Sequence, residues 1–388
     1  MKIIIAHPAD PVSPGAGGAV RWAINVATIL SRMGCSVTLI GWRNQGRIKT
    51  DKLPFEFIPI FTGPYNWKRY VMELFCKLPI FNIDRRAIIL THRFDVMTAF
   101  TLWKPANPKI MVSTGPLFAA KSLWPRTYPL IEQAYQIAEK YVLPKIDMIG
   151  IMDQITYRRY LKMDFIPKEK LKWTWTAVDT ELFSRSDVVN NPRYRQIASE
   201  DKMSLAFAGR LDKVKNVDFL LRSYSLLEKS SLNIELIILG AGPELRNLKN
   251  LAASLKLKNI SFPGEIPAVD MPCVLNSLDV IALPSIGGEG SPTILKEALA
   301  CGIPVVSTNV GDVRKFIKHP LAGRVVDELD ERRFAQAIHE VISMVKNDRE
   351  AVKKACRLIA NDYSMTEFGN HWCDLILDAQ VIRHNRRH

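Results

Sequence analysis

The sequence predicts an α/β protein made of two doubly wound parallel sheets. Short apolar runs alternate with amphipathic segments from end to end, which is the pattern of parallel strands joined by crossover helices. The chain has 388 residues, 47% hydrophobic and 24% charged, so it is long enough for two domains and too apolar for a disordered protein. We expect the two domains to face each other across a cleft.

The first predicted domain covers residues 1–185. It begins with a strand at 2–6, a glycine-rich turn at 13–18 and a helix at 18–33, whose apolar residues recur with helical periodicity. Gly34 ends this helix, and a second strand follows at 36–40. The same patterns predict strands at 55–59, 87–91, 109–113 and 146–150 and helices at 67–77 and 127–143.

The second predicted domain covers residues 200–363. Residues 184–203 are polar, contain a proline and show no sustained period, which indicates an interdomain linker. Beyond it, apolar runs that are each followed by a helical pattern predict strands at 203–208, 234–239, 279–283 and 304–307.

The basic excess of the chain is concentrated in the first predicted domain. The whole chain has a formal net charge of +14. Residues 1–185 hold 26 basic and 14 acidic side chains and seven of the eight tryptophans, whereas residues 186–388 hold 27 and 25. A nucleic acid, an anionic membrane surface and a phosphorylated ligand would each explain such a charge, and composition alone leaves the three open.

Targeting signals and cysteines bear on the compartment. The first ten residues turn polar too early for the apolar core of a secretory signal, and no apolar run reaches the roughly 18 residues of a membrane span. The six cysteines lie far apart without a Cys-x-x-Cys pair, which indicates neither a zinc site nor a disulfide framework. We therefore expect a cytoplasmic protein.

Two loops that follow predicted strands are candidate ligand sites, because open parallel sheets bind ligands outside the carboxyl ends of their strands. After the strand at 203–208, Arg210 offers a planar fork and Lys215 a point charge, a pair suited to a diphosphate. After the strand at 234–239, Gly240, Gly242 and Pro243 form a sharp turn that allows close backbone approach and aims a helix N-terminus at an anion. A solvated basic turn and a simple change of chain direction are the structural alternatives.

The loop after the strand at 279–283 is the most informative segment. Glycines surround Glu289, and a helix follows, with Ser291 placed to cap it and Pro292 in its first turn. Glu297 lies within that helix. Carboxylates accept bidentate hydrogen bonds from sugar or ribose hydroxyls, although an exposed carboxylate near a helix N-terminus is also favoured by the helix dipole alone.

These segments resemble the retaining nucleotide-sugar glycosyltransferases of glycosyltransferase family 4, which have the GT-B fold of two Rossmann-like domains. The family signature is a glutamate, seven intervening residues, a second glutamate and a Gly-x-Pro-Val-Val strand. Glu289, Glu297 and residues 302–306 match that spacing. The resemblance is strong over about 200–363 and weak between about 45 and 130.

Three further motifs carry the resemblance. The family's Gly-Arg-Leu with a lysine five residues after the arginine is met by residues 209–215, and its Gly-x-Gly-Pro turn by residues 240–243. A glycine pair that opens the first helix is met by Gly17 and Gly18.

The resemblance implies transfer of a sugar from a UDP- or GDP-linked donor to a hydroxyl, with retention at the anomeric carbon. Arg210, Lys215 and Glu289 form the implied catalytic set: the two cations offset charge growing on the diphosphate, and Glu289 binds the sugar. No metal is then needed, and no Asp-x-Asp motif is present to hold one. Glu297 would hold the ribose. The other implied donor contacts are Gly17, Gly18, Gly240, Gly242, Pro243, Ile266, Gly290, Ser291, Pro292 and Thr293.

Two features of the reaction stay open at the level of the sequence. Retention is compatible with a double displacement and with front-face departure, in which the leaving phosphate helps to deprotonate the acceptor. Many family members also carry a sugar-binding histidine after the strand at 109–113, where this chain has Ser113 and Thr114. Either hydroxyl, or His92 after the preceding strand, is the expected substitute, with a structural role for His92 as the alternative.

The resemblance assigns the acceptor to the first domain, and residues 364–388 resemble the family's closing helix, which packs back on that domain. Aromatic and basic residues mix at 65–75 and 121–126, which suits a membrane interface. We expect a glycan, lipid-linked or phosphorylated acceptor of cell-envelope glycan synthesis and peripheral attachment to an anionic membrane. No nucleic acid is expected, because zinc-finger spacing and RNA-binding aromatic motifs are absent. The alternatives are a non-catalytic nucleotide- or nucleic-acid-binding protein and another GT-B enzyme such as a nucleotide-sugar epimerase.

Overall fold

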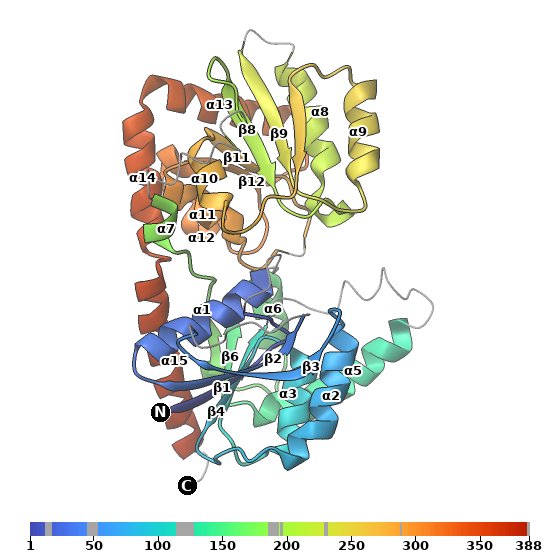
Figure 1. Ribbon diagram of the computed structural model, residues 1–388, viewed down its shortest axis with the longest axis vertical. Coiled ribbons are helices and arrows are strands. Elements are labelled where there is room, and N and C mark those ends of the chain that lie inside the picture. Colours follow the sequence, from blue (N-terminus) through green and yellow to red (C-terminus); the bar gives the residue numbers. More distant parts are fainter. Residues whose placement is uncertain are drawn as a thin grey trace. The chain divides into compact units, whose positions relative to one another are not determined.

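The protein folds into two compact units, each built around one parallel sheet (Figure 1). The computed structural model describes residues 1–11, 18–44, 53–113, 128–184, 194, 197–228, 232–287 and 289–385. Unit 1 comprises Met1–Thr176 and Met365–His388, and unit 2 comprises Ala177–Ser364. The predicted architecture of two doubly wound parallel sheets is confirmed.

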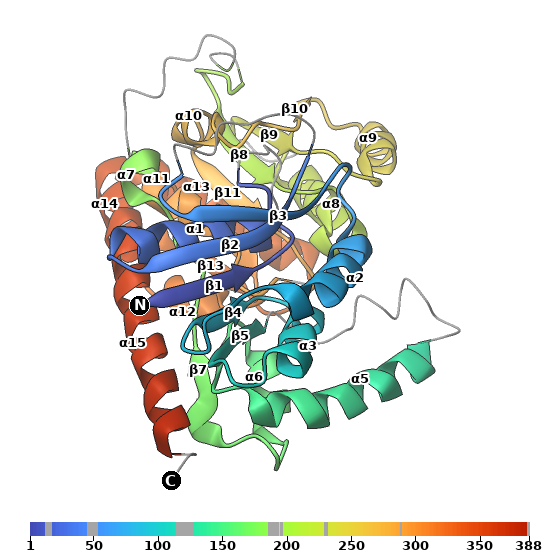
Figure 2. The same ribbon diagram turned by 60° about the horizontal axis from the view of Figure 1, so that its bottom comes forward.

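Within the described residues, the sheet of unit 1 has seven strands in the order β3-β2-β1-β4-β5-β6-β7. Every pairing is parallel, and Ile3 lies opposite both Val37 and Ile88. Figure 2 shows β1, β2 and β3 side by side. The strands are β1 (Lys2–Ala6), β2 (Ser36–Arg43), β3 (Glu56–Thr62), β4 (Ile88–Thr91), β5 (Lys109–Ser113), β6 (Met148–Ile151) and β7 (Leu171–Trp173).

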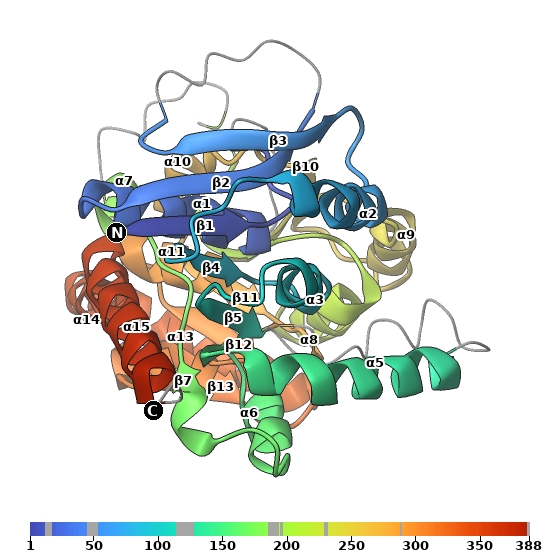
Figure 3. The same cartoon turned by 90° about the horizontal axis from the view of Figure 1, so that it is seen from below.

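Helices cover both faces of the unit 1 sheet. One group contains α1 (Gly18–Arg32) and α15 (Met365–Asn385), which pack together, with the rings of Trp22 and Trp372 5.8 Å apart. The other group comprises α2 (Trp67–Lys77), α3 (Phe94–Trp103) and α5 (Tyr128–Val142), which are labelled in Figure 3. Helix α2 packs on β3, α3 packs on β4 and β5, and α5 packs on α3. The short helix α6 (Gln154–Leu161) follows β6. Burial of strands on both faces explains why β1, β4 and β5 are continuous apolar runs.

Within the described residues, the sheet of unit 2 has six strands in the order β10-β9-β8-β11-β12-β13. Its strands are β8 (Met203–Ala208), β9 (Ile234–Leu239), β10 (Ile260–Gly264), β11 (Val280–Leu283), β12 (Val305–Thr308) and β13 (Gly323–Val326). Its helices are α7 (Thr180–Ser184), α8 (Val217–Leu227), α9 (Leu245–Ser254), α10 (Met271–Asn276), α11 (Thr293–Cys301), α12 (Val313–Phe316), α13 (Glu331–Asn347) and α14 (Arg349–Asn361).

Of the linker predicted at 184–203, residues 185–193, 195 and 196 lie outside the described residues, and the described remainder does not form a separate linker. These described residues belong to unit 2, where Tyr194 is buried in the core, Ile197 packs against it and the Tyr194 hydroxyl donates to Asp270 at 3.0 Å. The chain passes into unit 2 after Thr176 rather than at 185. The reason is that Val178 and Phe183 bury their side chains in the core of unit 2, as α7 packs on α10 and α11.

None of the helices in the described part of the chain combines the length and the apolar character that crossing a bilayer requires.

Candidate functional site

The loops after β8 and β9 pack backbone against backbone at the carboxyl edge of the unit 2 sheet. Leu211 donates its N–H to the carbonyl of Ala241 at 2.9 Å, and Glu244 donates to Leu211 at 3.0 Å. A Cβ on Gly240 would lie 1.9 Å from the carbonyl oxygen of Gly209, and one on Gly242 would lie 2.2 Å from that of Leu211. The glycines are therefore required for the contact between the loops, in addition to any role at an anion.

The structure places the two predicted cations differently. The Arg210 side chain is 73% exposed, and its Nε lies 3.7 Å from a carboxylate oxygen of Asp212. Asp212 also accepts a hydrogen bond from the Lys215 backbone N–H, which fixes the turn between β8 and α8. The Lys215 side chain is only 24% exposed, and its ammonium pairs with Glu289. Arg210 thus projects into solvent while Lys215 is committed to a carboxylate.

Glu289 is the centre of a small polar cluster. Its carboxylate accepts from the Lys215 ammonium and, at 2.9 Å, from the hydroxyl of the buried Ser285. The two loops that carry these residues are joined by the Ile286 N–H, which donates to Val214 at 2.9 Å, and by the Asn216 amide, which donates to Pro284 at 3.2 Å. The sequence indicated Lys215 and Glu289 but not Ser285, although a hydroxyl four residues before the glutamate was visible.

Residues 289–293 are called the donor loop here, after the role that the sequence predicts for them. The turn after β12 holds this loop from the side. The carbonyl of Gly290 accepts from the Asp312 N–H at 2.9 Å, and the Ser291 hydroxyl donates to the Asp312 carboxylate at 2.7 Å. The expected cap of α11 by Ser291 is wrong: Pro292 occupies the N-cap without a side-chain cap bond, because the Ser291 side chain is directed to Asp312.

Two further predicted donor contacts are largely buried. Glu297, on α11, is 5% exposed and lies one turn before Cys301; burial and the Glu297 charge both raise the pKa of that thiol. Ile266 follows β10 and is packed in the core of unit 2 at 8% exposure. Pro243 follows Gly242 in the turn before α9.

The candidate residues of unit 1 lie at the carboxyl ends of β1, β4 and β5. Gly18 is the first residue of α1, with open space where a Cβ would stand. His92 follows β4, its ring 4.9 Å from Trp22 and 5.8 Å from His7, and burial lowers its pKa to about 4. Ser113 ends β5 and shares a 3.2 Å hydrogen bond with the Tyr160 hydroxyl. Gly17 and Thr114 lie outside the described residues.

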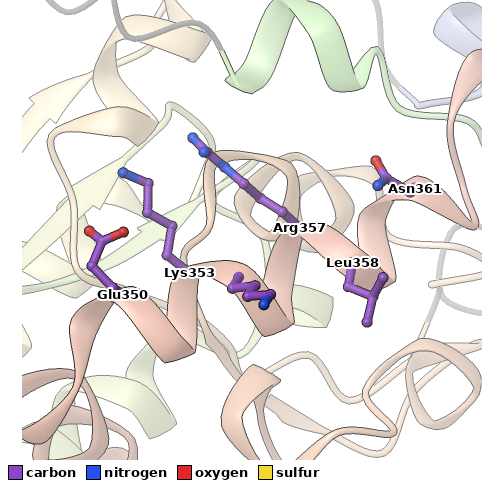
Figure 4. Close-up of a pocket in the computed structure, with 6 residues that line it drawn as sticks. Glu350, Lys353, Arg357, Leu358 and Asn361 are labelled. Atoms are coloured by element: carbon purple, nitrogen blue, oxygen red, sulfur yellow. The ribbon is translucent and has the colours of Figure 1, made fainter.

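Two grooves, each of about 360 Å³, open along α14 and α7 of unit 2 and share Arg357 and Asn361. Figure 4 shows Lys353 and Arg357 extending from one side of α14 and Leu358 from the other. None of the predicted site residues lines either groove. Among the described residues, no three His, Cys, Asp or Glu side chains gather as a metal site would require.

Comparison with known structures defines the class of fold. The structure is similar to sucrose-phosphate synthase from Thermosynechococcus elongatus, with a TM-score of 0.79, 16% identity and coverage of 98% of this chain and 100% of that one. It is also similar to HepE from Anabaena, solved in complex with UDP, with a TM-score of 0.73, 17% identity and coverage of 97% and 99%. The fold is the GT-B fold, as the sequence predicted.

Sequence comparison is more specific for unit 2. Residues 191–358 match the family model "Glycosyl transferases group 1". The chain is 28% identical over 218 residues to the putative colanic acid biosynthesis glycosyltransferase WcaL of Escherichia coli K12, covering 54% of this chain and 52% of the relative. It is 26% identical over 204 residues to a GDP-mannose-dependent phosphatidylinositol monomannoside mannosyltransferase of Mycolicibacterium smegmatis, covering 51% and 53%. The chain thus spans about half the length of the curated relatives it matches.

Proposed function

We propose that the chain is a retaining, metal-independent glycosyltransferase of family 4 that moves a sugar from a UDP- or GDP-linked donor to a hydroxyl. The observation that carries the proposal is the pairing of Lys215 with Glu289 at the carboxyl edge of the unit 2 sheet. Both residues lie within the segment that matches the group 1 glycosyltransferase model. They are also the cation and the carboxylate that the family motifs bring to the donor.

The proposed roles follow from the charges and exposures of the residues. The exposed Arg210 can exchange its 3.7 Å contact with Asp212 for the diphosphate, while the less exposed Lys215 supplies a second cation. As the glycosidic bond breaks, negative charge grows on the leaving diphosphate, and fixed cations stabilise it. Glu289 already accepts from Ser285 and Lys215, so it is oriented to bind sugar hydroxyls. Glu297 is assigned to the ribose on the family pattern.

The proposed acceptor is a glycan, a lipid-linked molecule or a phosphorylated molecule of envelope glycan synthesis, bound by unit 1. The names of the two curated relatives refer to colanic acid synthesis and to a phosphatidylinositol mannoside, and this supports the class of acceptor. Unit 1 also carries nearly all of the net positive charge of the chain. A soluble enzyme at the cytoplasmic face of an anionic membrane, without a nucleic-acid partner, is the setting that we propose.

An apolar patch on α2, the turn Leu78–Ile80 after it and α3 is the proposed membrane contact. It consists of Met72, Phe75, Ile80 and Trp103, which are 68%, 39%, 81% and 44% exposed. The rings of Phe75 and Trp103 lie 5.6 Å apart, so the two helices contribute to one surface. Exposed cations, Lys68 and Arg69, lie on the same helix α2. Aromatic side chains beside cations suit the headgroup region of an anionic bilayer.

The donor reaction is tested by release of nucleoside diphosphate from UDP-, GDP- and ADP-sugars, with candidate acceptors present. Glu289→Gln and Arg210→Ala are expected to lower kcat on the order of 100-fold or more, because each removes a group aimed at the donor. Lys213→Ala is the matched control, since Lys213 is an exposed cation in the same loop. Full activity in both site variants would overturn the assignment, and nucleotide binding without turnover would favour a non-catalytic protein.

The membrane contact is tested separately with anionic phosphatidylglycerol liposomes at low salt. The double variant Met72→Ser, Phe75→Ser is expected to lower the fraction of protein that co-sediments with the liposomes. Leu358→Ser, which changes a leucine of unit 2 that is 67% exposed, is expected to leave it unchanged. Absence of liposome binding by the unaltered protein would remove the membrane from the proposal and leave the donor chemistry intact.

A further inference from the structure

A buried ionic network lies beside the donor loop, and no role has yet been given to it. Lys296 is fully buried on α11, and its ammonium contacts the hydroxyl of Ser291 and, at 3.3 Å, the carboxylate of Asp312. The Ser291 hydroxyl itself donates to the same carboxylate oxygen at 2.7 Å. Three polar groups from three successive segments of unit 2 therefore converge on one point.

The network is continuous with the backbone of the donor loop. Gly311 has a φ of 56°, and a Cβ there would lie 2.4 Å from the carbonyl oxygen of Gly290 and 2.7 Å from that of Glu289. The next residue, Asp312, donates its N–H to the Gly290 carbonyl. Asp312 thus binds the loop twice, through its backbone to Gly290 and through its side chain to Ser291, and Lys296 holds that side chain.

Aromatic rings complete the enclosure of the Lys296 ammonium. It lies 5.2 Å from the ring centroid of Phe316 and 4.7 Å from that of Tyr363, within the range of cation–π contacts. Burial lowers the pKa of Lys296, and the neighbouring Asp312 opposes that shift. Lys296 is thus removed from bulk water, with the Ser291 hydroxyl, the Asp312 carboxylate and two aromatic rings around its charge.

A buried ionic network of this kind fixes the geometry of its members more than it adds to the free energy of unfolding. A buried ion pair has a desolvation penalty that its attraction only partly offsets, so an apolar replacement of similar volume is often as stable. An apolar replacement makes no directional hydrogen bonds, whereas the charged groups fix the Ser291 hydroxyl at one place. A loop that must present backbone and side-chain groups to a ligand gains from such fixed support.

We propose that Lys296, with Asp312, is a positioning residue that holds the donor loop in the conformation that binds the nucleotide sugar. The inference rests on the proposed function, because it assigns a support to that same site. Lys296 acts through Ser291 and Gly290 and does not contact the donor itself. Its loss loosens the loop, so that donor binding weakens while the acceptor, which is assigned to unit 1, binds as before.

The test uses the full chain with Lys296→Met and Asp312→Asn combined, which removes both buried charges and leaves neither unpaired. We expect KM for the donor sugar, and Kd for UDP or GDP measured by calorimetry, to rise about tenfold or more, with KM for the acceptor unchanged. Lys170→Met is the matched control. Lys170 is also fully buried, but its ammonium donates to the carbonyls of Pro144 and Ile146 in unit 1.

Each outcome decides one point. An unchanged donor KM and nucleotide Kd in a folded double variant would overturn the positioning role, as would an equal change in the Lys170→Met control. If the double variant does not fold, Asp312→Asn alone, which leaves Lys296 bonded to Ser291, is expected to raise the donor KM in the same direction. Failure of the unaltered protein to bind UDP or GDP would instead contradict the proposed function, so the two failures are distinguishable.

Discussion

Unit 1 and unit 2 share a parallel-sheet architecture but differ in the chemistry of their side chains. Unit 1 contains 28 basic and 15 acidic residues and all eight tryptophans, whereas unit 2 contains 25 and 24 and no tryptophan. Aromatic packing such as that of Trp22 with Trp372 stabilises unit 1, while polar contacts such as Lys215 with Glu289 order the carboxyl edge of unit 2. One practical result is that tryptophan fluorescence reports the folding of unit 1 alone.

The largest expected effect is the loss of a tryptophan from unit 1. Trp372 is fully buried against Trp22 and Phe368, so Trp372→Ala should cost about 4 kcal/mol of unfolding free energy. Chemical denaturation followed by fluorescence should show this loss, while far-UV circular dichroism, to which both units contribute, should keep an unshifted component from unit 2. Leu377→Ala, at a position on α15 that is 58% exposed, is the control and should change little. A parallel shift of both transitions would mean that the units unfold as one.

The next effect concerns the close loops of unit 2. An alanine at Gly242 would place its Cβ 2.2 Å from the Leu211 carbonyl oxygen, so the loops must separate at a cost of about 3 kcal/mol. The circular dichroism component that comes from unit 2 should move, and the fluorescence transition, which follows unit 1, should not. Gly287→Ala is the matched control, because nothing lies within 4 Å of its Cβ position. Equal stability of the two variants would contradict the backbone packing described for residues 209–244.

Acid should distinguish the units through the histidines of unit 1. Burial holds the pKa of His92 at about 4 and that of His7 well below its usual value, so the unfolded chain binds more protons than the folded one. No stability is lost above about pH 6.5; as the pH falls from there toward 4, unit 1 should lose about 3 kcal/mol through His92, with a further loss through His7. Fluorescence-detected unfolding at several pH values measures this slope. His92→Gln should flatten it, and an unchanged slope in that variant would assign the effect elsewhere.

The smallest expected effect is on a surface ion pair of unit 2. Arg324 contacts Glu340 at 2.9 Å, but the two side chains are 33% and 42% exposed. Because water screens such a pair, Glu340→Gln should cost about 0.5 kcal/mol or less in a thermal scan at moderate salt. A cost several times larger would show that exposed pairs contribute to unit 2 as its buried contacts do.

The parts of the fold that the sequence predicted are those with strong periodicity or continuous apolar runs. Strands β1, β8 and β9 lie where the sequence predicts them, because burial on both faces leaves a continuous run of apolar residues. Helix α2 lies where its helical periodicity predicts it. The edge strand β10 was not predicted, since alternate residues are half-exposed and Pro263 interrupts it. The four-residue strand β13 begins at Gly323, a residue that usually indicates a turn.

The candidate site was predictable where charge and spacing were distinctive. Lys215 and Glu289 are 74 residues apart in sequence and still form an ion pair, because they follow β8 and β11, which are neighbours in the sheet. Ser285, Lys296 and Asp312 were not predicted. For Lys296 the reason is that a lysine inside an amphipathic helix gives no sign that it is fully buried. The described part of the polar stretch at 184–203 differs from its prediction for the opposite reason: its described apolar residues, among them Tyr194, pack on a core formed by distant segments.

The entry and the exit of unit 2 lie side by side. The Val178 N–H donates to the Tyr363 carbonyl at 2.9 Å, and Val178 forms an isolated parallel bridge with Ser364. Unit 2 is therefore an insertion into unit 1, attached by two adjacent segments of chain. A segment whose ends meet can be excised, transplanted into another host or given new termini with little disturbance, so residues 177–364 form a natural cassette for exchanging the donor specificity that we propose for this unit.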